Sequence, residues 1–184
     1  MRIAMLAATA AIALLTGCNQ SADNQPANSV AAKNAQVLPV RDNAAVLVRA
    51  PANKEAALKL MHDRHEDMEK IGKATKAISR ELKASAPNLA TIRSSAATIA
   101  GLAPKVPAWF PPRTGPDVGK TMAKPEIWQK PQDFAAKSKS FEQAALAFHA
   151  AARSGDIASI KTRFADLGKS CKACHDSYRN EHKK

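Results

Sequence analysis

The chain has 184 residues, of which 28 are Lys or Arg and 16 are Asp or Glu, so its formal net charge is +12. This length accommodates one ordinary domain together with export and tether segments. Strong positive charge first suggests nucleic-acid binding, but the basic residues alternate with acidic ones, without an arginine-rich arm or an aromatic stacking platform. We therefore expect no nucleic-acid partner, and an acidic protein partner attracted by long-range electrostatics fits better.

The first 18 residues are typical of a bacterial lipoprotein signal. Arg2 supplies the positive charge, and residues 3–15 form an apolar run that is too short to span a bilayer. The sequence Leu15-Thr16-Gly17-Cys18 resembles a lipobox, so we expect Cys18 to be lipidated and to anchor a periplasmic protein to the membrane. An ordinary secretory signal with an incidental Cys18 is the alternative.

Residues 19–53 are polar and contain Pro26, Pro39 and Pro51, which predicts a flexible tether. Residues 54–184 form the predicted domain. Hydrophobic residues there recur at steps of three and four, a period typical of amphipathic helices.

Four helices are predicted. The first begins at Lys54 and is ended by Pro87, the second covers residues 89–103, the third covers 134–155, and Asp156 caps the fourth. The residues predicted to face the interior are Leu58, Met61, His65, Met68, Ile71 or Gly72, Thr75, Ile78 and Leu82 on the first helix, Leu89, Ile92, Ala96, Ile99 and Ala103 on the second, Phe134, Ser138, Phe141, Ala145, Phe148 and Ala152 on the third, and Ile157, Ile160, Phe164, Leu167, Cys171, Cys174 and Tyr178 on the fourth.

Residues 104–131 hold seven of the eleven prolines and are predicted to form one long crossover loop. The fold class is therefore all-α, an antiparallel four-helix bundle with one long crossover loop. Aromatic residues make up only 4% of the chain, so a buried cofactor would supply apolar volume that the side chains lack.

Cys171-Lys172-Ala173-Cys174-His175 is the C-x-x-C-H pattern of covalent haem attachment. On a helix, residues three and four apart share a face, so both sulfurs reach one porphyrin and His175 can bind its iron. A zinc site would need a second ligand pair, and a thioredoxin-like dithiol would need a βαβ unit; the sequence offers neither. Haem c with iron is the cofactor that the pattern favours.

From Lys54 onward the sequence resembles the class II cytochromes c, the cytochrome c prime family. The resemblance rests on the haem motif near the C-terminus and on a broad set of further positions. These are Arg64, Met68, Gly72 and Ile78 on the first helix, Pro107 to Pro111, Lys120, Thr121 and Ala123 to Trp128 in the loop, and Gly155, Asp156, Gly168, Asp176, Tyr178 and Arg179 toward the end.

The resemblance implies a haem buried between the helices near one end of the bundle. It places Met68 opposite His175, where a methionine ligates iron in a low-spin branch of the family. Met61 and Met122 are weaker alternatives to Met68, and His65 is a minor one.

The resemblance also gives roles to residues around the haem. It implies that Arg64 and Arg179 neighbour the haem propionates or the histidine side, with solvated helix charges as the alternative for each. Thr121 and Phe110 are expected at the haem edge, His65 beside the haem, and Trp128 between the loop and the bundle. We expect His62, His149 and His182 at the surface.

Two functions follow. The first is a periplasmic one-electron carrier with a His175/Met68-ligated haem and no enzymatic reaction. The alternative is a five-coordinate cytochrome c prime that binds nitric oxide or another diatomic gas. A peroxidase is disfavoured because Arg64 and His65 are adjacent in sequence and therefore diverge on a helix. A homodimer is compatible with the resemblance, although the charged outer face of the first helix fits solvent equally well.

Overall fold

The computed structural model describes residues 49–181, which belong to the compact unit Asp42–Lys184. The predicted signal, Cys18, His182 and most of the tether lie outside the described residues. The elements, in chain order, are the α-helices α1 (Lys54–Glu81) and α2 (Leu89–Leu102), the 3₁₀ helix η1 (Ala103–Trp109), and the α-helices α3 (Glu126–Gln129), α4 (Pro131–Ser154) and α5 (Ile157–Tyr178). Within residues 49–181 the only β-pairing is one isolated bridge, so the predicted all-α class is confirmed.

Side-chain caps determine where three of the long helices begin. Asn53 and Asn88 each accept a hydrogen bond from the backbone N–H three residues later, at the starts of α1 and α2. Asp156 accepts from the N–H groups of Ala158 and Ser159, as predicted. Gly155 has φ 82°, the left-handed conformation that ends α4 and lets α5 return at once.

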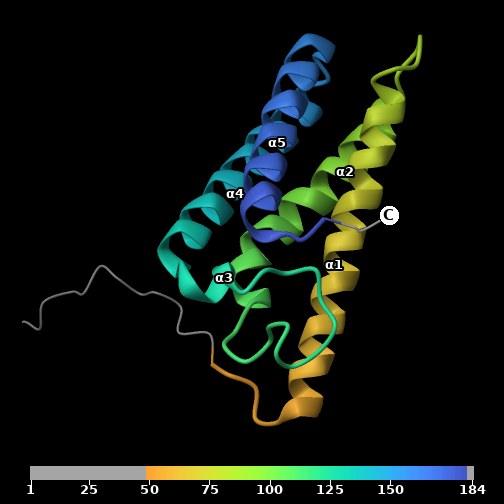
Figure 1. Ribbon diagram of the computed structural model, residues 1–184. Helices are drawn as coiled ribbons and strands as arrows, with labels where there is room; N and C mark the ends of the chain where they lie inside the picture. The colour runs from red at the N-terminus through yellow and green to blue at the C-terminus, as the bar shows by residue number, and fades with distance from the viewer. Residues whose placement is uncertain (1–48, 182–184) are drawn as a thin grey trace, which may run out of the picture. The chain divides into compact units, whose positions relative to one another are not determined.

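The four long helices form two pairs, α1 with α2 and α4 with α5, and α2 packs against α4 to join them (Figure 1). The fourth side of the bundle, between α1 and α5, is different. No Cα atom of α5 comes within 8 Å of one in α1, although both helices are fully described. Packed helix axes lie about 8–10 Å apart, so α1 and α5 do not close on one another as the other pairs do.

The predicted inner faces of α2, α4 and α5 are confirmed, because every residue named for them is buried or half-buried. For α1 the prediction is wrong at two residues that were expected to face the interior. Leu58 is 41% exposed, and His65 is exposed as well. The buried stripe passes instead through Ala57, Met61 and Arg64, which turns Leu58 and His65 to the border of the face.

The crossover is more structured than predicted, since it contains η1 and α3. The first helix also ends at Glu81, before Pro87, and a short turn fills the gap. Trp128 packs the crossover onto the bundle as expected, and its indole N–H donates to the carbonyls of Phe110 and Pro111 at 3.2 and 3.0 Å. In the part of the chain described, no helix is both long and apolar enough to cross a membrane.

Candidate haem site

The C-x-x-C-H motif lies on the last two turns of α5. Cys171 and Cys174 are half-buried, form no disulfide and pack against the hydrophobic core. His175 is exposed on the flank of α5 that also carries Gly168, seven residues earlier in the chain. The helix therefore presents two thiols toward the interior and an imidazole beside them.

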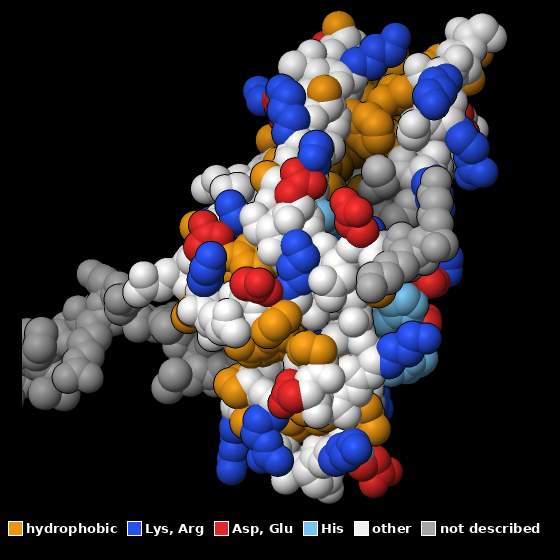
Figure 2. Space-filling view, viewed as in Figure 1, with side chains coloured by type: hydrophobic (Ala, Val, Ile, Leu, Met, Phe, Trp, Pro, Cys, Tyr) orange, Lys and Arg blue, Asp and Glu red, His pale blue; other side chains and the backbone are white. Residues whose placement is uncertain are grey.

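Two helix glycines, one on α1 and one on α5, have empty space beside them. A Cβ atom added to Gly72 of α1 or to Gly168 of α5 would meet no atom within 4 Å. Glycine inside a helix costs about 1 kcal/mol relative to alanine, and no neighbour within the described chain requires it here. The space-filling view shows hydrophobic side chains in the hollow between α5 and the α1/α2 pair (Figure 2).

On the α1 side, Met68 is half-buried and packs against the core, four residues before Gly72. His65 has a side chain that is 70% exposed and lies 3.4 Å from Glu69, its partner one turn later. Met61 is buried in the core, and Met122 is half-buried in the crossover. His62 is exposed, as expected, whereas His149 is half-buried.

Arg64 is buried, and it fastens the crossover to α1. Its guanidinium donates to the carbonyls of Trp109 and Thr114 at 3.3 and 3.2 Å, and to the hydroxyls of Thr114 and Thr121 at 3.4 and 3.1 Å. It also lies 4.5 Å from the centroid of the Phe110 ring, a cation–π contact. Burial lowers the pKa of Arg64 to about 10. All four of these acceptors are neutral oxygens.

The alternative in which Arg64 is a solvated helix charge is therefore wrong. Burial of a cation disfavours its charged form unless partners compensate, and neutral acceptors compensate less than a carboxylate does. Thr114 could not be predicted as a partner of Arg64, because the proline-rich crossover has no hydrophobic period. The burial of Arg64 had one signal in the sequence: Arg64 follows Met61 by three residues and so falls on the same, mostly apolar, face of the helix.

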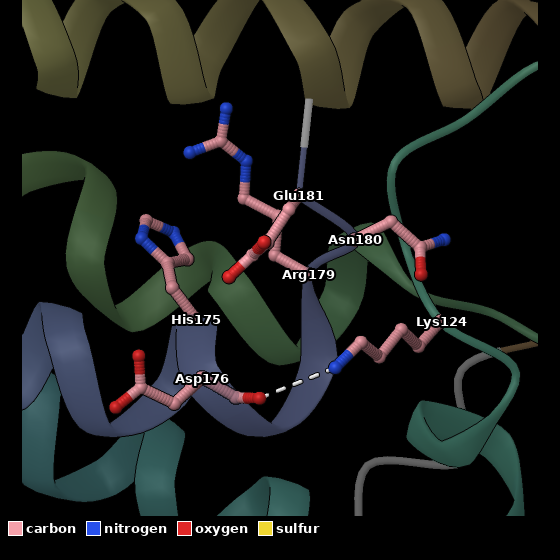
Figure 3. A pocket seen from close by; sticks show the side chains of 6 residues that line it. All are labelled: Lys124, His175, Asp176, Arg179, Asn180 and Glu181. Atoms are coloured by element: carbon pink, nitrogen blue, oxygen red, sulfur yellow. Dashed lines mark hydrogen bonds between the residues drawn. The ribbon is translucent and has the colours of Figure 1, made fainter. Parts of the chain in front are cut away.

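A polar pocket of about 440 Å³ lies at the C-terminal end of α5, next to the motif. Figure 3 shows its lining residues, which are Lys124, His175, Asp176, Arg179, Asn180 and Glu181. The side chains of His175, in the last turn of α5, and of Arg179, directly after the helix, project toward the same side (Figure 3). Arg179 thus lies beside His175, and because its side chain is exposed the solvated-charge alternative stays open.

The environment shifts the ionisation of the motif residues. Burial raises the pKa of the Cys171 thiol, and burial followed by the neighbouring Cys171 raises that of Cys174. Desolvation, and then the charge of Arg179, lower the pKa of His175. The imidazole is therefore biased toward its neutral form, which is the form that ligates metals.

These features fit a covalently bound haem. The two thiols point inward without a disulfide, the imidazole lies beside them, and α1 and α5 stay apart on that side of the bundle. When bound, haem iron supplies the redox and gas-binding chemistry. The chain would supply two thiols for attachment, an imidazole nitrogen as ligand and an apolar surround.

Comparison with known proteins points to one family. A family model described as "Cytochrome C'" matches residues 59–179. Curated relatives include cytochrome c' from Alcaligenes xylosoxydans, 40% identical over 67 residues, which cover 36% of this chain and 53% of that protein. Cytochrome c' from Pararhodospirillum photometricum is 34% identical over 116 residues, covering 63% and 92%. Cytochrome c-556 from Agrobacterium tumefaciens is 36% identical over 116 residues, covering 61% and 87%.

Solved structures agree with the sequence relatives. Cytochrome c' from Thermochromatium tepidum superposes with a TM-score of 0.64 at 30% identity, over 72% of this chain and all of that one. A cytochrome c' with ligand-controlled dimer dissociation gives 0.64 at 29% identity over the same shares. The nitric oxide complex of a leucine-to-isoleucine variant of cytochrome c prime from Alcaligenes xylosoxidans gives 0.62 at 30% identity, again over 72% and 100%.

The predicted four-helix bundle is confirmed by these superpositions, and the resemblance drawn from the sequence is confirmed by the family match. The match to this family covers all of α5 from its first turn through the haem motif. The chain belongs to the cytochrome c' family, the class II cytochromes c, whose cofactor is covalently bound haem c with its iron.

Proposed function

We propose that this protein holds one haem through Cys171 and Cys174, with His175 as iron ligand, and binds nitric oxide or another diatomic gas on the α1 side. The observation that carries the proposal is that the motif borders the one side of the bundle where two neighbouring long helices stay apart. A small ligand needs such space beside the iron.

We rank gas binding above the one-electron carrier that the sequence favours. A solved relative is a nitric oxide complex, and the curated relatives include several proteins named cytochrome c'. On the α1 side, the imidazole of His65 is solvent-exposed beside Glu69. That position does not favour His65 as a ligand from the interior. We propose no enzymatic reaction.

One observation favours a second candidate, the six-coordinate electron carrier. Met68 is half-buried on α1 and carries a thioether, which is a known sixth ligand in cytochromes. Cytochrome c-556 from Agrobacterium tumefaciens is also among the relatives. A Met68 bond to iron would close the site to gases and raise the reduction potential.

Visible spectra of the oxidised and reduced holoprotein, recorded with and without carbon monoxide, separate the two functions. Gas binding predicts broad high-spin bands in the reduced protein that shift when carbon monoxide is added. Sharp low-spin bands that the gas does not move would instead establish the electron carrier.

Variants of Met68 sharpen this test. If the sixth position is free, Met68→Ala and Met68→Leu keep high-spin spectra and change carbon monoxide affinity only through the volume beside the iron. If Met68 is a ligand, Met68→Ala converts a closed low-spin site into one that binds the gas. Met61→Leu is the matched control, because Met61 is buried in the core two turns earlier.

The buried Arg64 is proposed as a neighbour of a haem propionate. All four oxygens that accept hydrogen bonds from its guanidinium are neutral, and a haem propionate would supply a negative charge. Arg179, beside His175, is proposed as the corresponding neighbour on the histidine side, and Thr121 lies next to Arg64.

We further propose a periplasmic protein anchored through lipidated Cys18, with acidic redox partners attracted by its positive charge. Cys18→Ala should move the protein from the membrane fraction to the soluble fraction of the periplasm. Unchanged membrane association would contradict the anchor without affecting the haem assignment.

A homodimer is proposed on the α1 surface, where Leu58 and Leu60 are 41% and 37% exposed. One relative is a dimer whose dissociation is ligand-controlled. Light scattering of the holoprotein with and without carbon monoxide tests this, and a monomer at all concentrations would contradict it.

A further inference from the structure

Residues 121–124 of the crossover, which we call the strap, are hydrogen-bonded to α1 at their first residue. The guanidinium of Arg64 donates to Thr121 Oγ1 at 3.1 Å. The same oxygen accepts from the backbone N–H of Ala123, also at 3.1 Å. One hydroxyl therefore holds both a side chain of α1 and the backbone of the strap.

The rest of the strap is hydrogen-bonded to the end of α5. The N–H of Asn180 donates to the carbonyl of Met122 at 2.8 Å, and the N–H of Lys124 donates to the carbonyl of Tyr178 at 2.9 Å. These bonds form the antiparallel bridge between Ala123 and Arg179. Lys124 Nζ adds a bond to the carbonyl of Asp176 at 3.2 Å, seen in Figure 3.

The strap thus joins two helices whose Cα atoms stay more than 8 Å apart. Its attachment on α1 is Arg64, one turn before Met68, and its attachment on α5 begins at Asp176, directly after His175. The strap backbone bonds of 2.8 and 2.9 Å therefore form a continuous hydrogen-bonded connection between these two attachments.

We propose that Thr121 is a positioning residue: its hydroxyl couples α1 to the C-terminal end of α5 through the strap and so sets the placement of His175. This inference rests on the proposed attachment of haem at Cys171, Cys174 and His175. Thr121 acts through Arg64 and the strap backbone, a different role from the direct haem contact expected from the sequence.

The test compares Thr121→Val, which removes the hydroxyl at nearly constant volume, with Thr121→Ser, which keeps it. Thr98→Val is the matched control, since the Thr98 hydroxyl only donates to a carbonyl of its own helix. Hydrogen exchange of residues 176–181 in the holoprotein should become roughly tenfold faster in Thr121→Val, the loss expected for one hydrogen bond. Thr121→Ser and Thr98→Val should exchange like the wild type.

The second measurement is the reduction potential of the haem. It should shift in Thr121→Val, return to the wild-type value in Thr121→Ser, and stay unchanged in Thr98→Val. If hydrogen exchange becomes faster in Thr121→Val but the reduction potential does not change, the strap has only a structural role. That result would overturn the proposed coupling between Thr121 and His175. Equal behaviour of Thr121→Val and Thr121→Ser would overturn the role of the hydroxyl.

Two further results must be considered. If Thr121→Val does not fold, Lys124→Met removes one strap bond and should accelerate exchange of the same residues while shifting the potential in the same direction. If the wild-type protein carries no covalent haem, the proposed function fails on that result, and the placement of His175 by the strap fails with it.

Discussion

At the scale of single residues, Arg64 does the most to shape the crossover. One guanidinium binds three separate points of a proline-rich segment, at Trp109, Thr114 and Thr121, and stacks on Phe110. Only arginine has enough donors in a planar fork to reach such a set of acceptors at once. The crossover consequently has a defined path beside the haem motif, although most of it is neither helix nor strand.

Replacing Arg64 with glutamine should lower the free energy of unfolding of the holoprotein by about 1.5–3 kcal/mol, since hydrogen bonds to a charged group are lost. Urea denaturation followed by circular dichroism measures the change. Arg80→Gln is the control, because Arg80 is exposed in the last turn of α1. Equal destabilisation by the two substitutions would contradict the fastening role of Arg64.

At the scale of elements, the connection between α4 and α5 leaves almost no loop. Gly155 adopts φ 82°, and Asp156 then caps α5 with two backbone hydrogen bonds. The two helices are thereby forced to pack antiparallel along their length, with α5 on the outer edge. One flank of α5 remains uncovered as a result, and that flank carries Gly168 and His175.

The helix glycines give a prediction at this scale. Gly72→Leu should reduce covalent haem loading, because we expect the empty space beside Gly72 to receive the haem. The control is Gly101→Leu, which lies on the exposed face of α2 and also has no atom within 4 Å of an added Cβ. The ratio of Soret absorbance to protein concentration reports loading. Full loading of the Gly72 variant would show that this side does not receive the haem.

At the scale of the whole molecule, aromatic contacts join three parts of the chain at the haem end. Tyr178 of α5 packs edge-on against Phe134 of α4, and Phe134 against Phe110 of the crossover, with ring centroids 5.3 and 5.0 Å apart. The Tyr178 hydroxyl also donates a hydrogen bond to Asp133. Burial, then the bond to Asp133, raise the pKa of Tyr178 to about 12.

This pair predicts how stability depends on pH. An unfolded tyrosine ionises near pH 10, so the folded state, in which the pKa of Tyr178 is about 12, binds the phenolic proton more tightly. The contribution is complete below about pH 10 and is lost as pH rises toward 12. Tyr178→Phe should therefore flatten the alkaline decline of the melting temperature. The chain has one tyrosine, so no other phenol contributes.

In acid, the stability contributed by this pair depends on pH in the opposite direction. The hydrogen bond from Tyr178 lowers the pKa of Asp133, so this carboxylate stabilises the fold above its unfolded value and ceases to do so as pH falls. Melting curves of Tyr178→Phe should therefore also lose less stability in acid than those of the wild type. An unchanged profile in both ranges would mean that the pair does not contribute to stability in solution.

Local signals in the sequence determined the helices and the haem motif. The three- and four-residue period of hydrophobic residues, the caps at Asn88 and Asp156, and the left-handed Gly155 each act within a few residues of chain. The spacing of Cys171, Cys174 and His175 is likewise a local property of one helix turn. These features were predictable because the physical forces behind them operate over one or two turns.

Only the tertiary structure decided the rest. It placed Arg64 in the interior and Leu58 at the surface, because the neighbouring helix and crossover choose which border of a wide apolar stripe is covered. It brought Thr121 and Thr114 to Arg64, and residues 122–124 to the end of α5, across 50 or more residues of chain. Such contacts follow from how helices pack and where a loop is fastened, and no sequence period encodes them.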